Sequence, residues 1–253
     1  MGDQPGAAPG LRDLAREIPI IAAALVAYFW VRGLTEGSVA LAQANAADII
    51  HIEKHLGLHW EPWAQRLILD RNGLVSLANW IYIWGHWPVI AVSALWLFFR
   101  RPATYFLLRN AFLISGAIGL TIFITYPLAP PRLADVDVID TVTLYSHAYR
   151  VLQPPAWVNQ YAAMPSLHFG WNMLIGGGLA RESPLTAVRV FGWLMPTAMM
   201  CAVVLTANHY VIDVIAGAIV ALIGLLLAWE LRKLRRSLAA RHDHGANGRM
   251  PTP

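Results

Sequence analysis

The sequence predicts an all-α, polytopic membrane protein: a six-transmembrane-helix bundle with interfacial helices on the outer side. Three observations lead to this fold class. Of the 253 residues, 57% are hydrophobic and only 13% are charged, which is about half the charged fraction of an average soluble domain. The mean hydropathy is +0.48. The apolar residues also gather in runs close to the roughly 20 residues that a helix needs to cross a bilayer.

The apolar runs predict six spans, preceded by a cytoplasmic tail over residues 1–17 and followed by a disordered cytoplasmic tail over 237–253. The fourth run is the shortest and contains three consecutive glycines at 176–178. The membrane domain as a whole covers residues 18–236. The predicted spans are 18–34, 74–99, 105–126, 166–180, 188–205 and 210–231.

The positions of the cations predict the orientation. Cytoplasmic ends of membrane helices carry an excess of Lys and Arg. With the N-terminus inside, most of the 19 cationic residues fall on the inner side, close to helix ends. We therefore predict a multi-pass cell-membrane protein with both termini cytoplasmic. The inner cations are Arg12, Arg16, Arg100, Arg101, Arg109, Arg181, Arg189, Arg232, Lys233, Arg235, Arg236, Arg241 and Arg249.

Two longer stretches fall outside in this topology. Residues 35–73 carry periodic apolar residues among polar ones, followed by Trp60 and Trp63, which predicts helices lying in the interface. Residues 127–163 open with Pro127 and Pro130-Pro131 and are too long for a mere connector, which favours a functional or partly helical segment.

Composition also excludes several classes of site and partner. The single Cys201 excludes an intramolecular disulfide framework and any cysteine-based metal cluster. Basic residues form no stripe interleaved with aromatics, so we expect no nucleic-acid partner. His51, His55 and His59 recur every four residues, as metal ligands on a helix can. Gly57 ends that helix before the third histidine, so we interpret the row as a wet helix face and expect no metal site.

His209 and Asp213 form the first candidate catalytic pair. On a helix, residues four apart share one face. A carboxylate that holds one imidazole nitrogen fixes the tautomer and leaves the other nitrogen to attack an electrophile. The alternative is a buried pair that only holds helices together. Ionisable residues inside membrane segments favour the functional interpretation.

Two further segments are predicted to reach the same outer face. Pro165-Ser166 is a helix start, with Ser166 as its N-cap, which places His168 in the first turn. The free amides of such a start suit an anion. Arg132 follows two prolines, and its guanidinium can hold a phosphate bidentately. The alternatives are an ordinary helix start and an arginine that contacts lipid headgroups.

The combination of these segments resembles the type 2 phosphatidic acid phosphatase (PAP2) superfamily, in particular its inositol phosphorylceramide synthase-like branch. The resemblance rests on Pro-Ser-Leu-His at 165–168, His-Tyr-Val-Ile-Asp at 209–213 and Tyr-Pro-Leu-Ala-Pro-Pro-Arg at 126–132. It extends more loosely over residues 79–88, where Tyr82 and His86-Trp87-Pro88 are similar to the second-span pattern of that branch.

The resemblance implies a six-helix bundle and metal-independent phosphoryl transfer without a cofactor. It implies that His209 is the nucleophile that forms a phosphohistidine, that Asp213 orients it, and that His168 protonates the leaving oxygen. Arg132 would hold the phosphate. Further candidates for substrate contact are Ser166, Tyr210, His86 and Arg150, the last from the same outer segment as Arg132.

The sequence departs from the superfamily in two motifs. Ala94 stands where the first motif has its Lys, and Arg101-Pro102 lies on the predicted inner side. Ala202 and Val203 stand where the third motif begins with Ser-Arg. The usual phosphate-binding cations are thus missing from their familiar places. These departures favour the synthase-like branch over the standard phosphatases.

We therefore predict a transferase of phospholipid headgroup chemistry that acts at the outer membrane face. Its substrate would be a phospholipid or a polyprenyl phosphate, and its acceptor a polyol such as inositol. One alternative is a phosphatase of phosphatidate or polyprenyl pyrophosphate, in which water takes the phosphoryl group. A second is a transporter with these ionisable residues on its permeation path. The clustering of the candidate residues at one face favours an enzyme.

Overall fold

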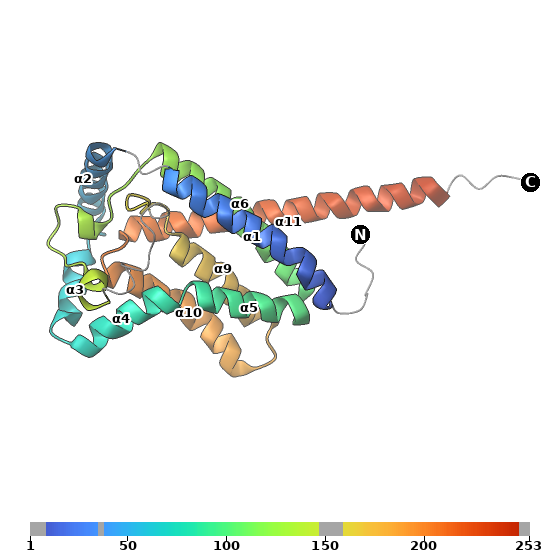
Figure 1. Cartoon of the computed structure of the whole chain (residues 1–253), viewed down its shortest axis with the longest axis horizontal. Coiled ribbons are helices and arrows are strands. Elements are labelled where there is room, and N and C mark those ends of the chain that lie inside the picture. The colour runs from blue at the N-terminus through green and yellow to red at the C-terminus, as the bar shows by residue number, and fades with distance from the viewer. Residues whose placement is uncertain (1–8, 35–37, 147–158, 248–253) are drawn as a thin grey trace, which may run out of the picture.

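The computed structural model describes residues 9–34, 38–146 and 159–247, and every regular element in these ranges is helical (Figure 1). Seven long or medium helices form the bundle, and four short or peripheral elements cover one end of it. The bundle elements are α1 (Leu11–Leu34), α4 (Asn72–Trp84), α5 (Trp87–Arg100), α6 (Pro102–Thr125), α9 (Leu167–Glu182), α10 (Thr186–Leu205) and α11 (Val211–Asn247). The others are α2 (Val39–Leu56), α3 (Glu61–Leu69), α7 (Thr141–Tyr145) and the 3₁₀ turn η1 (Pro131–Leu133).

Four of the described helices, α1, α6, α10 and α11, are long and apolar enough to cross a membrane. A fifth span results if α4 and α5 act as one, because they are separated by a short break with a bend of 48°. The chain is therefore a polytopic membrane protein with four to five candidate spans. The helix α9 has only 16 residues, fewer than the roughly 20 that a span needs. The predicted count of six spans stays a prediction.

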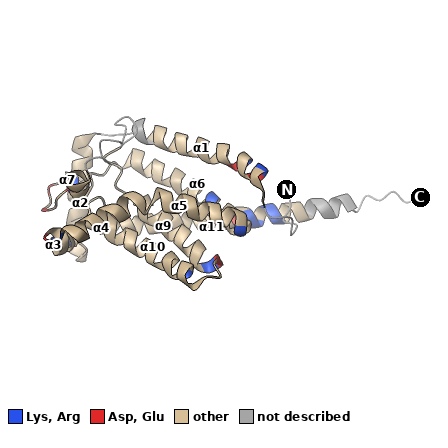
Figure 2. Cartoon of the chain, turned by 60° about the horizontal axis from the view of Figure 1, so that its bottom comes forward, with Lys and Arg blue, Asp and Glu red and all other residues tan. Residues whose placement is uncertain are grey.

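Charged residues lie mostly at the two ends of the bundle, whereas the middle of the helices is nearly free of them (Figure 2). Lys and Arg gather around the start of α1, the turn between α9 and α10, and the part of α11 that crosses this end. This distribution suits a bilayer, because a charged group is costly to hold in its hydrocarbon core.

The centre of the bundle is α9, which packs against α5, α6, α10 and α11. Small residues let the backbones approach closely, as membrane helices commonly do. A Cβ on Gly170 would stand 2.5 Å from the Gly217 carbonyl oxygen, and a Cβ on Gly217 would collide with the backbone of Ser166. The glycines therefore allow the start of α9 to lie directly on the first turns of α11.

The end of the bundle that carries α2, α3 and α7 is held together by amide side chains. Gln43 donates to the Leu133 carbonyl at 2.6 Å, and Asn45 donates to the Pro127 carbonyl at 2.7 Å. Gln65 both accepts from the Ile139 amide and donates to its carbonyl, at 2.7 and 2.8 Å. These bonds tie the predicted outer segment 127–163 to helices in the predicted outer segment 35–73.

The last helix is longer than the sequence prediction. We expected disorder from residue 237 onwards, whereas α11 continues to Asn247. The extension contains Leu, Ala and Arg, which have high helix propensity. It leaves the bundle as a single projecting helix (Figure 1). A polar composition alone does not exclude a helix.

Candidate active site

His209 and Asp213 come together at the start of α11. His209 Nδ1 lies 3.4 Å from Asp213 Oδ2, and both side chains are buried. The structure differs from the sequence argument in one detail, because His209 precedes the helix instead of lying on its face. Asp213 occupies the first turn and accepts a hydrogen bond from the Tyr210 amide at 2.9 Å. This bond is one half of a capping box, in which the N3 side chain accepts from the amide that precedes the helix, and it fixes the carboxylate next to the imidazole.

His168 faces this pair from the first turn of α9. Its ring centroid lies 5.8 Å from that of His209. The Ser166 amide donates to the Asp213 carbonyl at 2.9 Å, so the starts of the two helices are bonded directly. On its other side, the His168 ring is stacked on Tyr82 at 5.0 Å between centroids. The two histidines are therefore close enough for one phosphoryl group to contact both.

His86 joins the site because α4 and α5 are bent where they meet. Gly85 ends α4, His86 is the residue before α5, and Pro88 sits in the first turn of α5, where the missing amide of proline is tolerated. The bend brings the His86 ring within 4.4 Å of the His168 ring, between centroids. His86 is 3% exposed. This residue, a predicted substrate contact, lies directly against the His168 ring.

Asn172 was not predicted, and it links the His86 ring to the backbone of His168. Its Nδ2 lies 2.9 Å from His86 Nδ1 and donates to the His168 carbonyl at 2.7 Å. Asn172 is fully buried. Its position four residues after His168 in a predicted helix is a signal that could have found it, since such residues share a face.

Arg132 reaches the start of α11 from η1. Its backbone amide donates to the Ala207 carbonyl at 2.9 Å, and its Nε donates to Asn208 Oδ1 at 3.0 Å. Its Nη1 lies 3.7 Å from Asp140 Oδ2. The guanidinium is thus held beside the residue that precedes His209. Arg150, the second predicted cation, lies outside the described residues.

The remaining predicted contacts occupy two different settings. Ser166 is fully buried, and its Oγ has no hydrogen-bond partner in the described part of the chain. Tyr210 is also fully buried, but its ring packs in an apolar cluster with Ala42, Ala46 and Ile49 of α2. Its hydroxyl likewise lacks a hydrogen-bond partner among the described residues. Tyr210 contacts the candidate site through its backbone amide, which holds Asp213.

Two buried carboxylates that the sequence analysis missed complete the start of α11. Glu53 of α2 accepts from the Ile212 amide, and Glu61 of α3 accepts from the Val211 amide, both at 2.9 Å. Carboxylates stabilise a helix N-terminus because they satisfy free amides and complement the helix dipole. Burial first, and then the charge of Glu61, raise the pKa of Glu53 from 4.5 to about 8. Ionising both groups is therefore costly without a counter-charge.

His59 lies against these carboxylates and not in a row with His51 and His55. The helix α2 ends at Leu56, and Gly57 closes it with a φ of 68° in the left-handed region. The chain then turns, and His59 Nδ1 stands 3.3 Å from Glu61 Oε2. The expected end of the helix before the third histidine is confirmed.

A protein-family model described as PAP2 superfamily matches residues 47–227. The match covers well over half of the chain, which belongs to this superfamily of membrane enzymes. The resemblance drawn from the motifs is confirmed.

Among individual proteins, the chain is similar to the inositol phosphorylceramide synthase catalytic subunit aur1 of Schizosaccharomyces pombe. The two are 24% identical over 183 residues, which cover 64% of this chain and 42% of the relative. The chain thus matches less than half of the relative's length. No solved structure matches the chain.

Proposed function

We propose that the protein transfers a phosphate-containing group from a lipid donor to a hydroxyl acceptor through a phosphohistidine on His209. The observation that carries this proposal is the buried His209–Asp213 pair with His168 at 5.8 Å between ring centroids. With Asp213 at Nδ1, the proton is favoured on that nitrogen, which leaves the Nε2 lone pair for phosphorus. Membership of an enzyme superfamily also favours this role over the transporter alternative.

The proposed reaction has two steps. In the first, His209 Nε2 forms a bond to phosphorus while the bond from phosphorus to the lipid oxygen breaks, and protonated His168 gives its proton to that oxygen. In the second, neutral His168 takes a proton from the acceptor hydroxyl, whose oxygen bonds to phosphorus as the P–N bond breaks. Arg132 would offset charge on the phosphoryl oxygens, because such transition states are stabilised chiefly by positioning and electrostatics. No metal or cofactor carries a step.

The nature of the acceptor separates the transferase from the phosphatase. The similarity to a protein named as a synthase favours a hydroxyl acceptor, whereas in a phosphatase water would take the group. The test is mass spectrometry of the products after the purified protein is incubated with phospholipids and polyprenyl phosphates, with and without inositol. We expect a new product in which the phosphate-containing group is attached to the hydroxyl acceptor. Release of free phosphate, or of the free phosphorylated headgroup, without transfer to any acceptor tried would assign the phosphatase instead.

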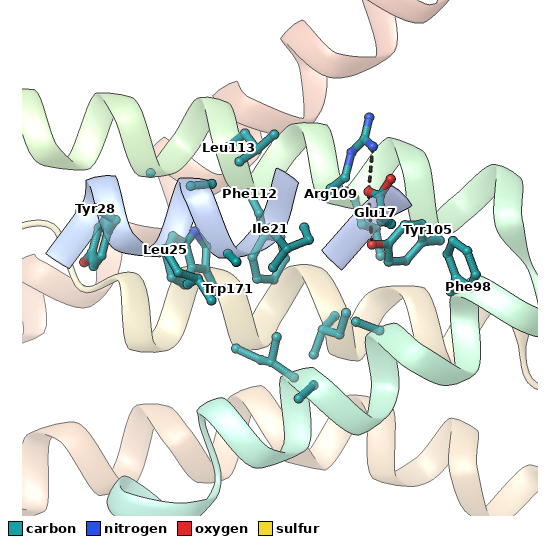
Figure 3. Close-up of a pocket in the computed structure, with 18 of the residues that line it drawn as sticks. Glu17, Ile21, Leu25, Tyr28, Phe98, Tyr105, Arg109, Phe112, Leu113 and Trp171 are labelled. Atoms are coloured by element: carbon teal, nitrogen blue, oxygen red, sulfur yellow. Dashed lines mark hydrogen bonds and ion pairs between the residues drawn. The ribbon is translucent and has the colours of Figure 1, made fainter. Parts of the chain in front are cut away.

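A cavity of about 630 Å³ beside the site supports a lipid substrate. Its wall is apolar and is built from α1, α5 and α6, and it includes Trp171 of α9 (Figure 3). Trp171 is stacked on His86, with 6.0 Å between centroids and 5° between planes. At the far end, Glu17 accepts from Arg109 and Tyr105, at 2.6 and 3.2 Å. We propose that this cavity holds a hydrocarbon chain of the lipid donor.

Filling this cavity is expected to weaken the reaction of long-chain lipids only. Ala24 of α1 lines the cavity, whereas the neighbouring Ala23 does not and is exposed. An indole at position 24 would displace part of the chain, and two lost methylene contacts at about 0.8 kcal/mol each lower kcat/KM about tenfold. The measurement is kcat/KM of Ala24→Trp for a long-chain and a short-chain lipid with the same headgroup.

Ala23→Trp is the matched control and is expected to leave both values unchanged. If Ala24→Trp lowered kcat/KM equally for both lipids, or for neither, the hydrocarbon chain would have to lie elsewhere.

We also propose that both termini are cytoplasmic, that the site faces the extracytoplasmic side, and that α9 is a short sixth span within the bundle. The gathering of cations at the end with the start of α1 supports this orientation (Figure 2). In a Cys201→Ser background, a membrane-impermeant maleimide is expected to label Asn72→Cys in intact cells. Ser237→Cys should react only after lysis. The opposite pattern would reverse the orientation.

A further inference from the structure

Three side chains from the loop and helices before α4 point their ligand atoms at one another. Glu53 of α2, His59 of the following turn and Glu61 of α3 each offer one such atom, and all three atoms lie within 4.8 Å of one another. His59 Nδ1 stands 3.8 Å from Glu53 Oε2 and 3.3 Å from Glu61 Oε2. None of the three belongs to the proposed reacting set.

The three atoms are buried and lack hydrogen-bond partners. Glu53 and Glu61 are 0% and 1% exposed. Glu53 Oε2, His59 Nδ1 and Glu61 Oε2 are all buried atoms with no hydrogen-bond partner in the described part of the chain. A buried polar atom without a partner is costly, and a buried charge more so. Three such atoms directed at one point form an arrangement that a bound cation would satisfy.

We propose that Glu53, His59 and Glu61 bind a divalent transition-metal cation, most simply Zn²⁺. An imidazole nitrogen with two carboxylate oxygens is a ligand set that suits zinc, whereas Ca²⁺ and Mg²⁺ prefer oxygen ligands alone. The charge of the cation would offset that of the two ionised carboxylates.

The surroundings of the cluster match those of known metal sites. Ligating carboxylates are normally oriented by hydrogen bonds through their other oxygen. Here the second oxygens, Oε1 of Glu53 and Oε1 of Glu61, accept from the Ile212 and Val211 amides. The His59 side chain is 19% exposed, which gives the cation an entry path from the solvent at this end of the bundle.

The bound cation would join α2, α3 and the first turn of α11. That turn holds Asp213 and follows His209. The metal site would therefore stabilise the helix turn on which the active-site residues are mounted, without touching the reacting atoms. Its loss should therefore lower thermal stability, while the phosphoryl-transfer chemistry itself contains no metal step.

The test uses the full-length protein without a polyhistidine tag, purified in detergent. Other histidines can bind zinc weakly, above all the neighbouring His51 and His55 on α2. The background variant therefore carries alanine at the five histidines that lie outside the cluster and the active site, namely His51, His55, His147, His242 and His244. Zinc is added, excess is removed by dialysis, and metal content is measured by mass spectrometry together with Tm.

We expect about one zinc per chain in this background and a Tm several degrees above that of the chelator-treated protein, because binding to the folded state alone stabilises it. Adding His59→Ala should reduce zinc to the level of a buffer blank and remove the shift. This substitution keeps both carboxylates on the α11 amides, so it spares the helix cap.

Substoichiometric zinc in the background variant, or equal zinc content after His59→Ala, would overturn the site. The first result would mean that a proton alone balances the carboxylates. Co²⁺ added in place of Zn²⁺ gives an independent reading, because its visible absorption reports a protein-bound ion. Neither measurement depends on turnover, so the outcome is separate from that of the proposed function.

Discussion

His209→Ala is expected to abolish transfer from lipid phosphates, with a fall in kcat of more than about 10³-fold. The reason is that the proposed covalent bond to phosphorus is made by Nε2 of His209, which this substitution removes. His168, at 5.8 Å between centroids, is stacked on Tyr82 and lies beside His86, and Asp213 is held by the Tyr210 amide. Neither is placed to replace the lost nucleophile.

The measurement that isolates this step is the covalent intermediate itself. After brief incubation with a lipid donor labelled with ³²P, the wild-type protein should carry label that is released by acid, as expected of a P–N bond. His209→Ala should carry none. His55→Ala, which removes an exposed histidine of α2, is the control for nonspecific labelling. Full turnover by His209→Ala would contradict the proposed mechanism, whatever the labelling result.

The proximity of the three motifs could be predicted because a bilayer restricts where the ends of spanning helices can lie. Apolar runs of spanning length place their ends at one of two faces, and the cations choose between the faces. Arg132, His168 and His209 each adjoin such an end, so the predicted topology puts them on the same side. The structure brings the starts of α9 and α11 into contact through the Ser166 amide and the Asp213 carbonyl.

The residues that sequence reasoning missed are those whose partners are distant in the chain. Glu53 and Glu61 lie in a predicted interfacial segment, where a carboxylate ordinarily faces water. Their partners are the amides of Ile212 and Val211, and backbone amides carry no sequence signature. The bend that directs His86 into the core is similar, because Gly85 and Pro88 predict a break but not its direction.

The helix α9 shows a third limit of prediction from the sequence. With 16 residues it is shorter than the roughly 20 residues that a span needs. Its run of glycines also predicts weak helix propensity. In the fold it is the central helix, and most of its residues are buried against four neighbours. Close approach to Gly217 and Gly192 requires glycine at 170 and 176. The features that weaken the helix in isolation are those that let it pack.

His168→Ala is expected to lower kcat on a natural lipid donor by about 10²- to 10⁴-fold, the usual contribution of a general acid. The alkoxide leaving group of such a lipid departs poorly without a proton, and His168 is the titratable side chain proposed to supply it. Because removal of the ring leaves a cavity beside Tyr82 and His86, His168→Gln serves as a second variant that better preserves the volume. Both should purify as folded protein with near wild-type Tm.

Leaving-group dependence separates this acid role from a positioning role. A nitrophenyl ester of the same headgroup needs no proton to depart, so His168→Ala and His168→Gln should lose far less activity on it than on the alkyl ester. His209→Ala should lose both activities equally, because the nucleophile is needed whatever leaves. The ratio of the two kcat/KM values for each variant is therefore the decisive measurement. Equal losses on both esters in the His168 variants would show that the ring only shapes the site. Another group would then have to be the proton donor.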